Sequence, residues 1–133
     1  MALIRNYLIA LVVFFAIDIL WLGFIAKDLY RENLSHLMAP KTNWLAAVIF
    51  YSIFIGGLMF FAINPALEKD SIVYALAVGA LFGFMTYATY DMTNLSTLKD
   101  WPIKITIIDI LWGTALNGVT ASIAFYIIKL FQR

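Results

Sequence analysis

Four long apolar stretches dominate the sequence, at about residues 3–26, 43–63, 71–90 and 103–131. Each has the roughly 20 residues that a helix needs to cross ~30 Å of hydrocarbon. Backbone groups cannot stay unpaired in lipid, so runs of this kind fold as helices. The alternation typical of strands is absent. We therefore predict an all-α protein, a four-span transmembrane antiparallel helix bundle.

Composition supports an integral membrane protein. Of the 133 residues, 64% are hydrophobic and 13% are charged, about half the usual charged share of a soluble domain. A soluble chain of this length could not cover so much apolar surface, so we expect residues 1–133 to form a single integral membrane domain with membrane lipid as its partner. The net charge of +1 gives no indication of nucleic-acid binding, and the absence of cysteine excludes disulfides and thiolate chemistry.

The segments that flank the apolar stretches set the expected topology. The N-terminal stretch carries Asp18 and has no clear cleavage site, so we expect a first transmembrane helix rather than a signal peptide. Residues 64–70 and 93–101 are predicted to be turns, with Asp100 as the cap of the last helix. Residues 27–42 are predicted to be a solvated loop, although their spacing would also allow the first helix to continue into water or along the interface. Lys and Arg divide four against five between the two ends, so the positive-inside rule gives no orientation.

The sequence Asp-Ile-Leu-Trp occurs twice, at residues 18–21 in the first stretch and 109–112 in the last. Asp18 lies nine residues before Lys27, and Asp109 lies five residues after Lys104. At 1.5 Å per residue these spacings correspond to depths of about 13 and about 8 Å in two antiparallel helices. Both aspartates should therefore lie in one half of the bilayer, near the end that carries the first and third loops, which we call the odd-loop end.

Polar residues on the last two helices fall on helical stripes. The third helix brings Tyr87, Tyr90, Asp91 and Asn94 to the odd-loop end, and its Gly79 and Gly83 form a pair that allows close helix approach. The last helix has a stripe of small and polar residues spaced by three or four: Thr106, Asp109, Gly113, Asn117 and Thr120. The second helix has few polar residues and is expected only to pack. We predict a polar pocket between the first, third and fourth helices, open toward the odd-loop end.

Ionisable side chains inside a membrane usually face an interior or a wet cavity, which makes them candidates for function. The proposed catalytic residues are Asp18, Asp109 and Asp91, since neighbouring carboxyl groups can act as an acid and base pair. The proposed ligand-binding residues are Trp21, Trp112, Tyr87, Tyr90, Asn94, Thr106 and Asn117. With one histidine and no cysteine, we expect neither a metal site nor a cofactor.

Three motifs, in order, resemble those of a bacterial family of small predicted membrane proteins, the domain of unknown function numbered two-one-seven-seven. They are Phe14-x3-Asp18-x2-Trp21-Leu22-Gly23, Tyr90-Asp91-Met92-Thr93-Asn94 with Leu98-x2-Trp101-Pro102, and Asp109-x2-Trp112-Gly113. The resemblance covers nearly the whole chain. It implies a four-span protein of the bacterial inner membrane and supplies no activity.

Three hypotheses for function remain open from the residues. The protein could bind or transform a lipid or another apolar small molecule by acid–base chemistry. It could be a small proton-coupled transporter, or a structural protein whose polar faces bury against another subunit. A homodimer is compatible with the second and third. For Asp18 and Asp109 the alternative to function is hydrogen bonding between helices, and for Asp91 and Asn94 it is the end of a helix.

Overall fold

The computed structural model describes residues 2–132, and four long helical segments account for most of them. The first is α1 (Ala2–Leu20), continued by a π-helical turn, η1 (Trp21–Ile25). The second joins α3 (Trp44–Leu58), the π-helical η3 (Met59–Ile63) and α4 (Asn64–Lys69). The third and fourth are α5 (Ile72–Thr97) and α6 (Ile103–Phe131). The predicted all-α class with four membrane-spanning helices is confirmed.

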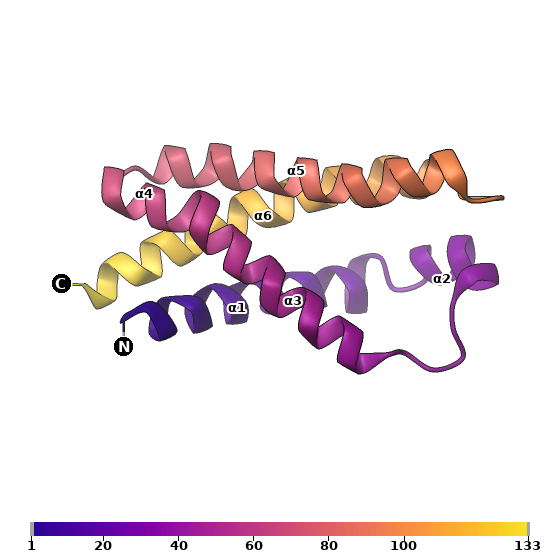
Figure 1. Cartoon of the computed structure of the whole chain (residues 1–133), viewed down its shortest axis with the longest axis horizontal. Coiled ribbons are helices and arrows are strands. Elements are labelled where there is room, and N and C mark those ends of the chain that lie inside the picture. Colours follow the sequence, from indigo (N-terminus) through magenta and orange to yellow (C-terminus); the bar gives the residue numbers. More distant parts are fainter. Residues whose placement is uncertain (1, 133) are drawn as a thin grey trace.

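Successive spans run in opposite directions (Figure 1). Both ends of the chain and the α4–α5 turn lie at one end of the molecule. The opposite, odd-loop end carries the α1–α3 connection and the start of α6. The first half of α3 diverges from α1, and its side chains at Trp44, Leu45 and Val48 are exposed. In a membrane these apolar side chains face lipid, as expected of a multi-pass membrane protein.

Helices α5 and α6 form the closest pair of spans, because glycine lets their backbones approach. A Cβ atom placed on Gly79 would lie 2.7 Å from the Cβ of Ala121 and 2.8 Å from the backbone oxygen of Asn117. Gly83 faces the same helix, with the side chain of Asn117 against it. The Gly79 and Gly83 pair therefore does what its spacing predicted.

The second span is longer than the sequence indicated, since residues 64–69 are helical rather than a turn. Pro65 has no N–H to offer the preceding turn, and the wider π-helical turn η3 just before it accommodates this loss. The chain reverses instead at Asp70, whose φ of 51° is left-handed, and Ser71 caps α5 by accepting a hydrogen bond from the Tyr74 N–H at 3.0 Å.

The third helix continues seven residues past Tyr90, so the prediction of a turn from residue 93 is wrong. Its polar end stays helical because threonine hydroxyls donate to carbonyls one turn back, as Thr89 does to Met85 at 2.6 Å and Thr97 to Thr93 at 2.8 Å. The helix-end interpretation of Asp91 fails with it, because Asp91 lies within the helix. Asp100 has a φ of 61° and does not cap α6, whose N-cap residue is Pro102.

The connection between the first two spans is partly ordered as helix, although the sequence predicted a solvated loop. It contains α2 (Leu29–Leu34) and the 3-10 turn η2 (Ser35–Leu37). The His36 Nε2 atom donates to the Asp100 carbonyl at 3.1 Å, which ties this connection to the α5–α6 connection. Charged side chains such as Arg31 and Glu32 are exposed, while Tyr30 and Leu34 on the other face are half-buried.

Candidate functional site

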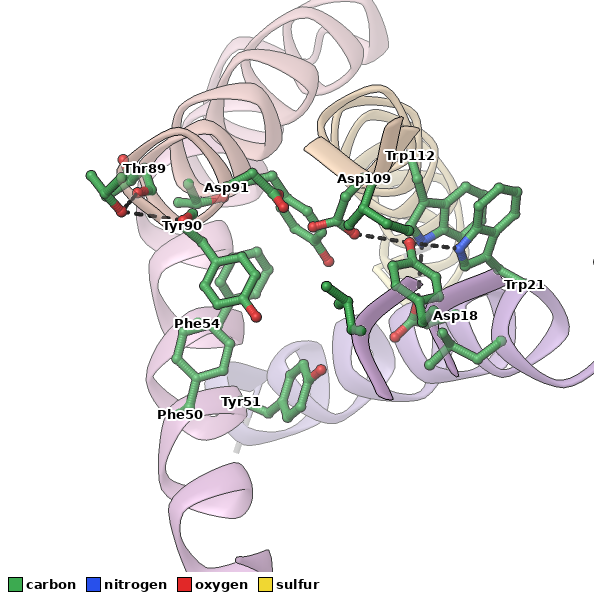
Figure 2. Close-up of a pocket in the computed structure, with 17 residues that line it drawn as sticks. Asp18, Trp21, Phe50, Tyr51, Phe54, Thr89, Tyr90, Asp91, Asp109 and Trp112 are labelled. Atoms are coloured by element: carbon green, nitrogen blue, oxygen red, sulfur yellow. Dashed lines mark hydrogen bonds between the residues drawn. The ribbon is translucent and has the colours of Figure 1, made fainter. Parts of the chain in front are cut away.

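A cavity of about 690 Å³ lies at the odd-loop end of the bundle, between all four spans and α2 (Figure 2). Its walls contain three carboxyl groups, eight aromatic rings, three threonines and three aliphatic side chains. They are Asp18, Asp91 and Asp109; Trp21, Tyr30, Phe50, Tyr51, Phe54, Tyr87, Tyr90 and Trp112; Thr86, Thr89 and Thr93; and Leu22, Leu34 and Ile105.

The two Asp-Ile-Leu-Trp segments meet across the cavity wall. The indole rings of Trp21 and Trp112 stack with centroids 4.4 Å apart and planes 9° from parallel. The Trp112 Nε1–H donates to Asp18 Oδ1 at 3.1 Å, although Asp18 belongs to the other segment. The hydrogen bond therefore crosses between the two helices and does not join each tryptophan to the aspartate three residues before it.

Tyr30 completes this arrangement from α2. Its hydroxyl accepts a hydrogen bond from Trp21 Nε1 at 3.1 Å and donates to Asp109 Oδ1 at 2.9 Å. Burial raises the pKa of the Tyr30 hydroxyl, and the negative charge of Asp109 adds to the increase. Trp112 thus bonds directly to Asp18 of the first segment. Trp21 is linked to Asp109 of the second segment through the Tyr30 hydroxyl.

Sequence reasoning missed Tyr30 because it lies in a charged connection. The signal that could have found it is the spacing of Tyr30 and Leu34, two non-charged side chains four residues apart, which is one face of a short helix.

Asp91 differs from the other two aspartates. Its side chain is 0% exposed, compared with 7% for Asp18 and 9% for Asp109. Neither of its carboxylate oxygens has a hydrogen-bond partner among residues 2–132. Its carboxyl group faces that of Asp109 (Figure 2), at a separation that a single shared proton would bridge. A buried carboxyl group that meets another carboxyl group and no donor needs compensation by a proton or by a bound group.

No basic side chain offsets these three carboxyl groups. The cavity walls contain no lysine, arginine or histidine among the residues that the structure describes. The ion pair between Lys129 Nζ and Asp70, 2.7 Å long, lies at the opposite end of the bundle. Within residues 2–132, no group of three or more histidine, aspartate or glutamate side chains is arranged to hold a metal ion.

The second span contributes a wall of the cavity, whereas the sequence indicated only a packing helix. Phe50, Tyr51 and Phe54 from α3 line the side that faces α1 and α5. The Phe54 ring packs against Phe14 of α1 at a centroid distance of 5.5 Å and against Tyr87 of α5 at 6.4 Å. The cavity therefore lies among four spans and not three.

The sequence model of a family described as "Predicted membrane protein (DUF2177)" matches residues 3–126. The chain belongs to this family. The match confirms the resemblance carried by the three motifs, and with the four apolar helices it identifies a multi-pass membrane protein. No curated protein and no solved structure matches the chain.

Seven of the ten candidate site residues of this DUF2177 chain line the cavity: Asp18, Trp21, Tyr87, Tyr90, Asp91, Asp109 and Trp112. The other three lie outside the lining. Thr106 is buried at the start of α6, where its hydroxyl accepts from the Trp101 indole N–H at 3.0 Å. Asn117 is buried between α5 and α6 and donates to the Gly113 carbonyl at 2.8 Å. Asn94 is half-buried, and its backbone carbonyl accepts a hydrogen bond from the Leu98 N–H at 2.8 Å.

Proposed function

We propose that this protein binds a lipid or another apolar small molecule in the four-helix cavity and performs acid–base chemistry on it with its carboxyl groups. The aromatic and aliphatic walls suit an apolar body, and a volume of about 690 Å³ falls within the usual range of small-molecule sites. The cavity lies in the half of the bundle toward the odd-loop end, and two of its apolar wall residues, Leu22 and Phe50, are exposed at the outer surface, where lipid can reach them.

The observation that carries this proposal is the unpartnered carboxyl group of Asp91. Asp18 and Asp109 each accept a hydrogen bond from another segment, so helix association alone could account for them. Such bonds contribute ~0.6 kcal/mol on average in membranes, against ~2.5–3.5 kcal/mol for inserting the charged side chain. Asp91 accepts no hydrogen bond from a donor group, and the side chain it meets is the Asp109 carboxyl group. A buried carboxyl group that meets no donor and faces a second carboxyl group is suited to hold and exchange a proton.

The placement of Asp91 and Asp109 suits proton transfer. Two facing carboxyl groups can hold one proton between them, so that one acts as a general acid while the other acts as a general base. The tyrosine hydroxyls of Tyr51 and Tyr90 also point into the cavity and could orient a polar group of the ligand (Figure 2).

The proposal is tested with Asp91→Asn and Asp109→Asn, which keep the side-chain size and remove the charge. The matched control is Asp28→Asn, because Asp28 is an exposed acid near the same end and lies outside the cavity. We expect both cavity variants to fold and to lose co-purified apolar molecules and the lipid changes that overexpression of the wild type causes, as measured by mass spectrometry. Lipid profiles and co-purified material identical to those of wild type would refute the proposal.

A proton-coupled carrier is the second candidate, and the crossed contacts of the two Asp-Ile-Leu-Trp segments favour it. Carriers often place their sites where two repeated elements meet, and here the two segments contact one another from antiparallel helices. This candidate predicts proton flux coupled to transport of an apolar solute in proteoliposomes, lost in Asp18→Asn. Crosslinking in the same proteoliposomes would show whether a homodimer forms. Binding and conversion without flux would exclude the carrier.

A further inference from the structure

We propose that the ligand is an organic cation, an amine in protonated or quaternary form attached to an apolar body; this inference rests on the proposed function of the cavity. It names the chemical class of the ligand that the site would take.

The first support is the charge of the cavity. Asp18, Asp91 and Asp109 bring three carboxyl groups into it, and the described wall residues bring no positive side chain. Electrostatic attraction between a ligand cation and these groups is strong in such a place, because water and salt screen it less than at the surface. Asp18 and Asp109 keep some exposed surface for direct contact with a cation, and the buried Asp91, which meets no donor group, adds its charge close to Asp109.

The same charge argues against anionic lipids. A phosphate or carboxylate headgroup is normally held by arginine, lysine or a helix N-terminus. The five lysine and arginine side chains at this end are exposed and do not line the cavity: Lys27, Arg31, Lys41, Lys99 and Lys104. Phospholipids and fatty acids would therefore place like charges together, whereas an amine would not.

The second support is the aromatic wall opposite Asp18 and Asp109. In Figure 2 the rings of Phe54, Tyr51 and Tyr90 lie on one side of the cavity, while Asp18 and Asp109 lie on the other. A cation between these walls would meet carboxylates on one side and the electron-rich faces of aromatic rings on the other. Cation–π attraction of this kind strengthens when the site is desolvated, and it is the usual means of recognising quaternary ammonium groups.

An inorganic cation fits the site less well. Hard metal ions require several oxygen ligands at close range, and no group of three acidic or histidine side chains within residues 2–132 is so arranged. Aromatic rings fill most of the wall that further oxygen ligands would need to occupy.

The test compares two probes of the same shape that differ in charge. One is 4-butylbenzyl-trimethylammonium, and the other is its neutral carbon isostere, 4-butyl-neopentylbenzene. Binding to the whole protein in nanodiscs of zwitterionic lipid is measured by tryptophan fluorescence, with partition into empty nanodiscs subtracted. We expect the cation to bind at least about tenfold more tightly than the isostere, which corresponds to ~1.4 kcal/mol.

Variants then assign the preference to the cavity. Asp91→Asn should weaken binding of the cation by about tenfold, or ~1.4 kcal/mol, and leave binding of the neutral isostere unchanged, whereas Asp28→Asn should change neither. Circular dichroism establishes that each variant is folded. If Asp91→Asn does not fold, Asp18→Asn serves the same purpose, because its carboxylate also lines the cavity.

The outcomes separate this inference from the proposed function. Equal binding of the two probes would overturn the amine inference and leave the proposed apolar site intact. Failure of both probes to bind would overturn the two together. Tighter binding of the cation that neither aspartate variant reduces would place the cation outside the cavity and so overturn the inference.

Discussion

The close contact between α5 and α6 allows a stability prediction to be worked from the structure. We expect Gly79→Ala to destabilise the fold and Gly56→Ala to leave it unchanged or stabilise it. A Cβ at position 79 would lie 2.7 Å from the Ala121 Cβ and 2.8 Å from the Asn117 backbone oxygen. Neither atom is the end of a flexible side chain, so the two helices must separate. A Cβ at position 56 would meet nothing within 4 Å.

The magnitude follows from two opposing effects. Replacing glycine by alanine inside a helix gains up to ~1 kcal/mol of helix propensity at either position. Overpacking a tight contact costs about 1–3 kcal/mol, and this applies to position 79 alone. The propensity gain is the same at both positions, so it cancels when the two variants are compared. Gly79→Ala should therefore be about 1–3 kcal/mol less stable than Gly56→Ala.

Unfolding in mixed micelles with increasing dodecyl sulfate, followed by circular dichroism, measures this difference. Gly56→Ala is the matched control, because it makes the same chemical change in an apolar helix with open space around it. Equal midpoints for the two variants would refute the account of how α5 and α6 pack.

Three further predictions concern polar contacts. Tyr30→Phe should destabilise the protein by about 1–3 kcal/mol in a thermal melt, because it leaves the Trp21 N–H and one Asp109 oxygen without their partner; an unchanged melting temperature would contradict the bridging contact. Because the pKa of Tyr30 is raised in the fold by burial and by the charge of Asp109, its stabilising contribution should be complete below about pH 10 and decline as the pH rises further. Subtracting the ultraviolet titration of Tyr30→Phe from that of wild type measures this, and ionisation at the ordinary tyrosine value would disprove it. Asp70→Asn should cost no more than ~1 kcal/mol in the same melt, since its ion pair with Lys129 is at the surface; a larger loss would mean that the α4–α5 turn depends on this pair.

Much of the fold could be predicted because the bilayer allows few alternatives. Helix number and antiparallel order follow from the length of the apolar runs and the shortness of their connections. The spacing of Gly79 and Gly83 predicted a close approach of another helix, and the structure shows that α6 is that helix. Helix ends were less predictable. Hydropathy marks where the side chains become polar, whereas the helix of α5 continues to Thr97 on hydrogen bonds that threonine side chains make with the backbone.

The depth of the candidate site residues in the membrane could be predicted from the sequence, but their tertiary contacts could not. The antiparallel order of the spans was enough to predict that Asp18, Asp91 and Asp109 lie at one end of the bundle. Which donor reaches which carboxylate depends on how helices are rotated and tilted, and a stripe of residues does not give this. The crossed contact of Trp112 with Asp18 and the arrival of Tyr30 from α2 were therefore not predictable.

The crossed contacts also determine when the site can form during synthesis. Asp18 and its donor Trp112 are separated by 94 positions in the chain, and Tyr30 and Asp109 by 79. Chains emerge N-terminal end first, so the first three spans are made before α6 exists. During that interval Asp18 lacks its donor, and the Tyr30 hydroxyl can accept from Trp21 but has no Asp109 to which it can donate. The α6 wall of the cavity is therefore the last to be made, and a nascent chain arrested before α6 would lack Ile105, Asp109 and Trp112 from the cavity.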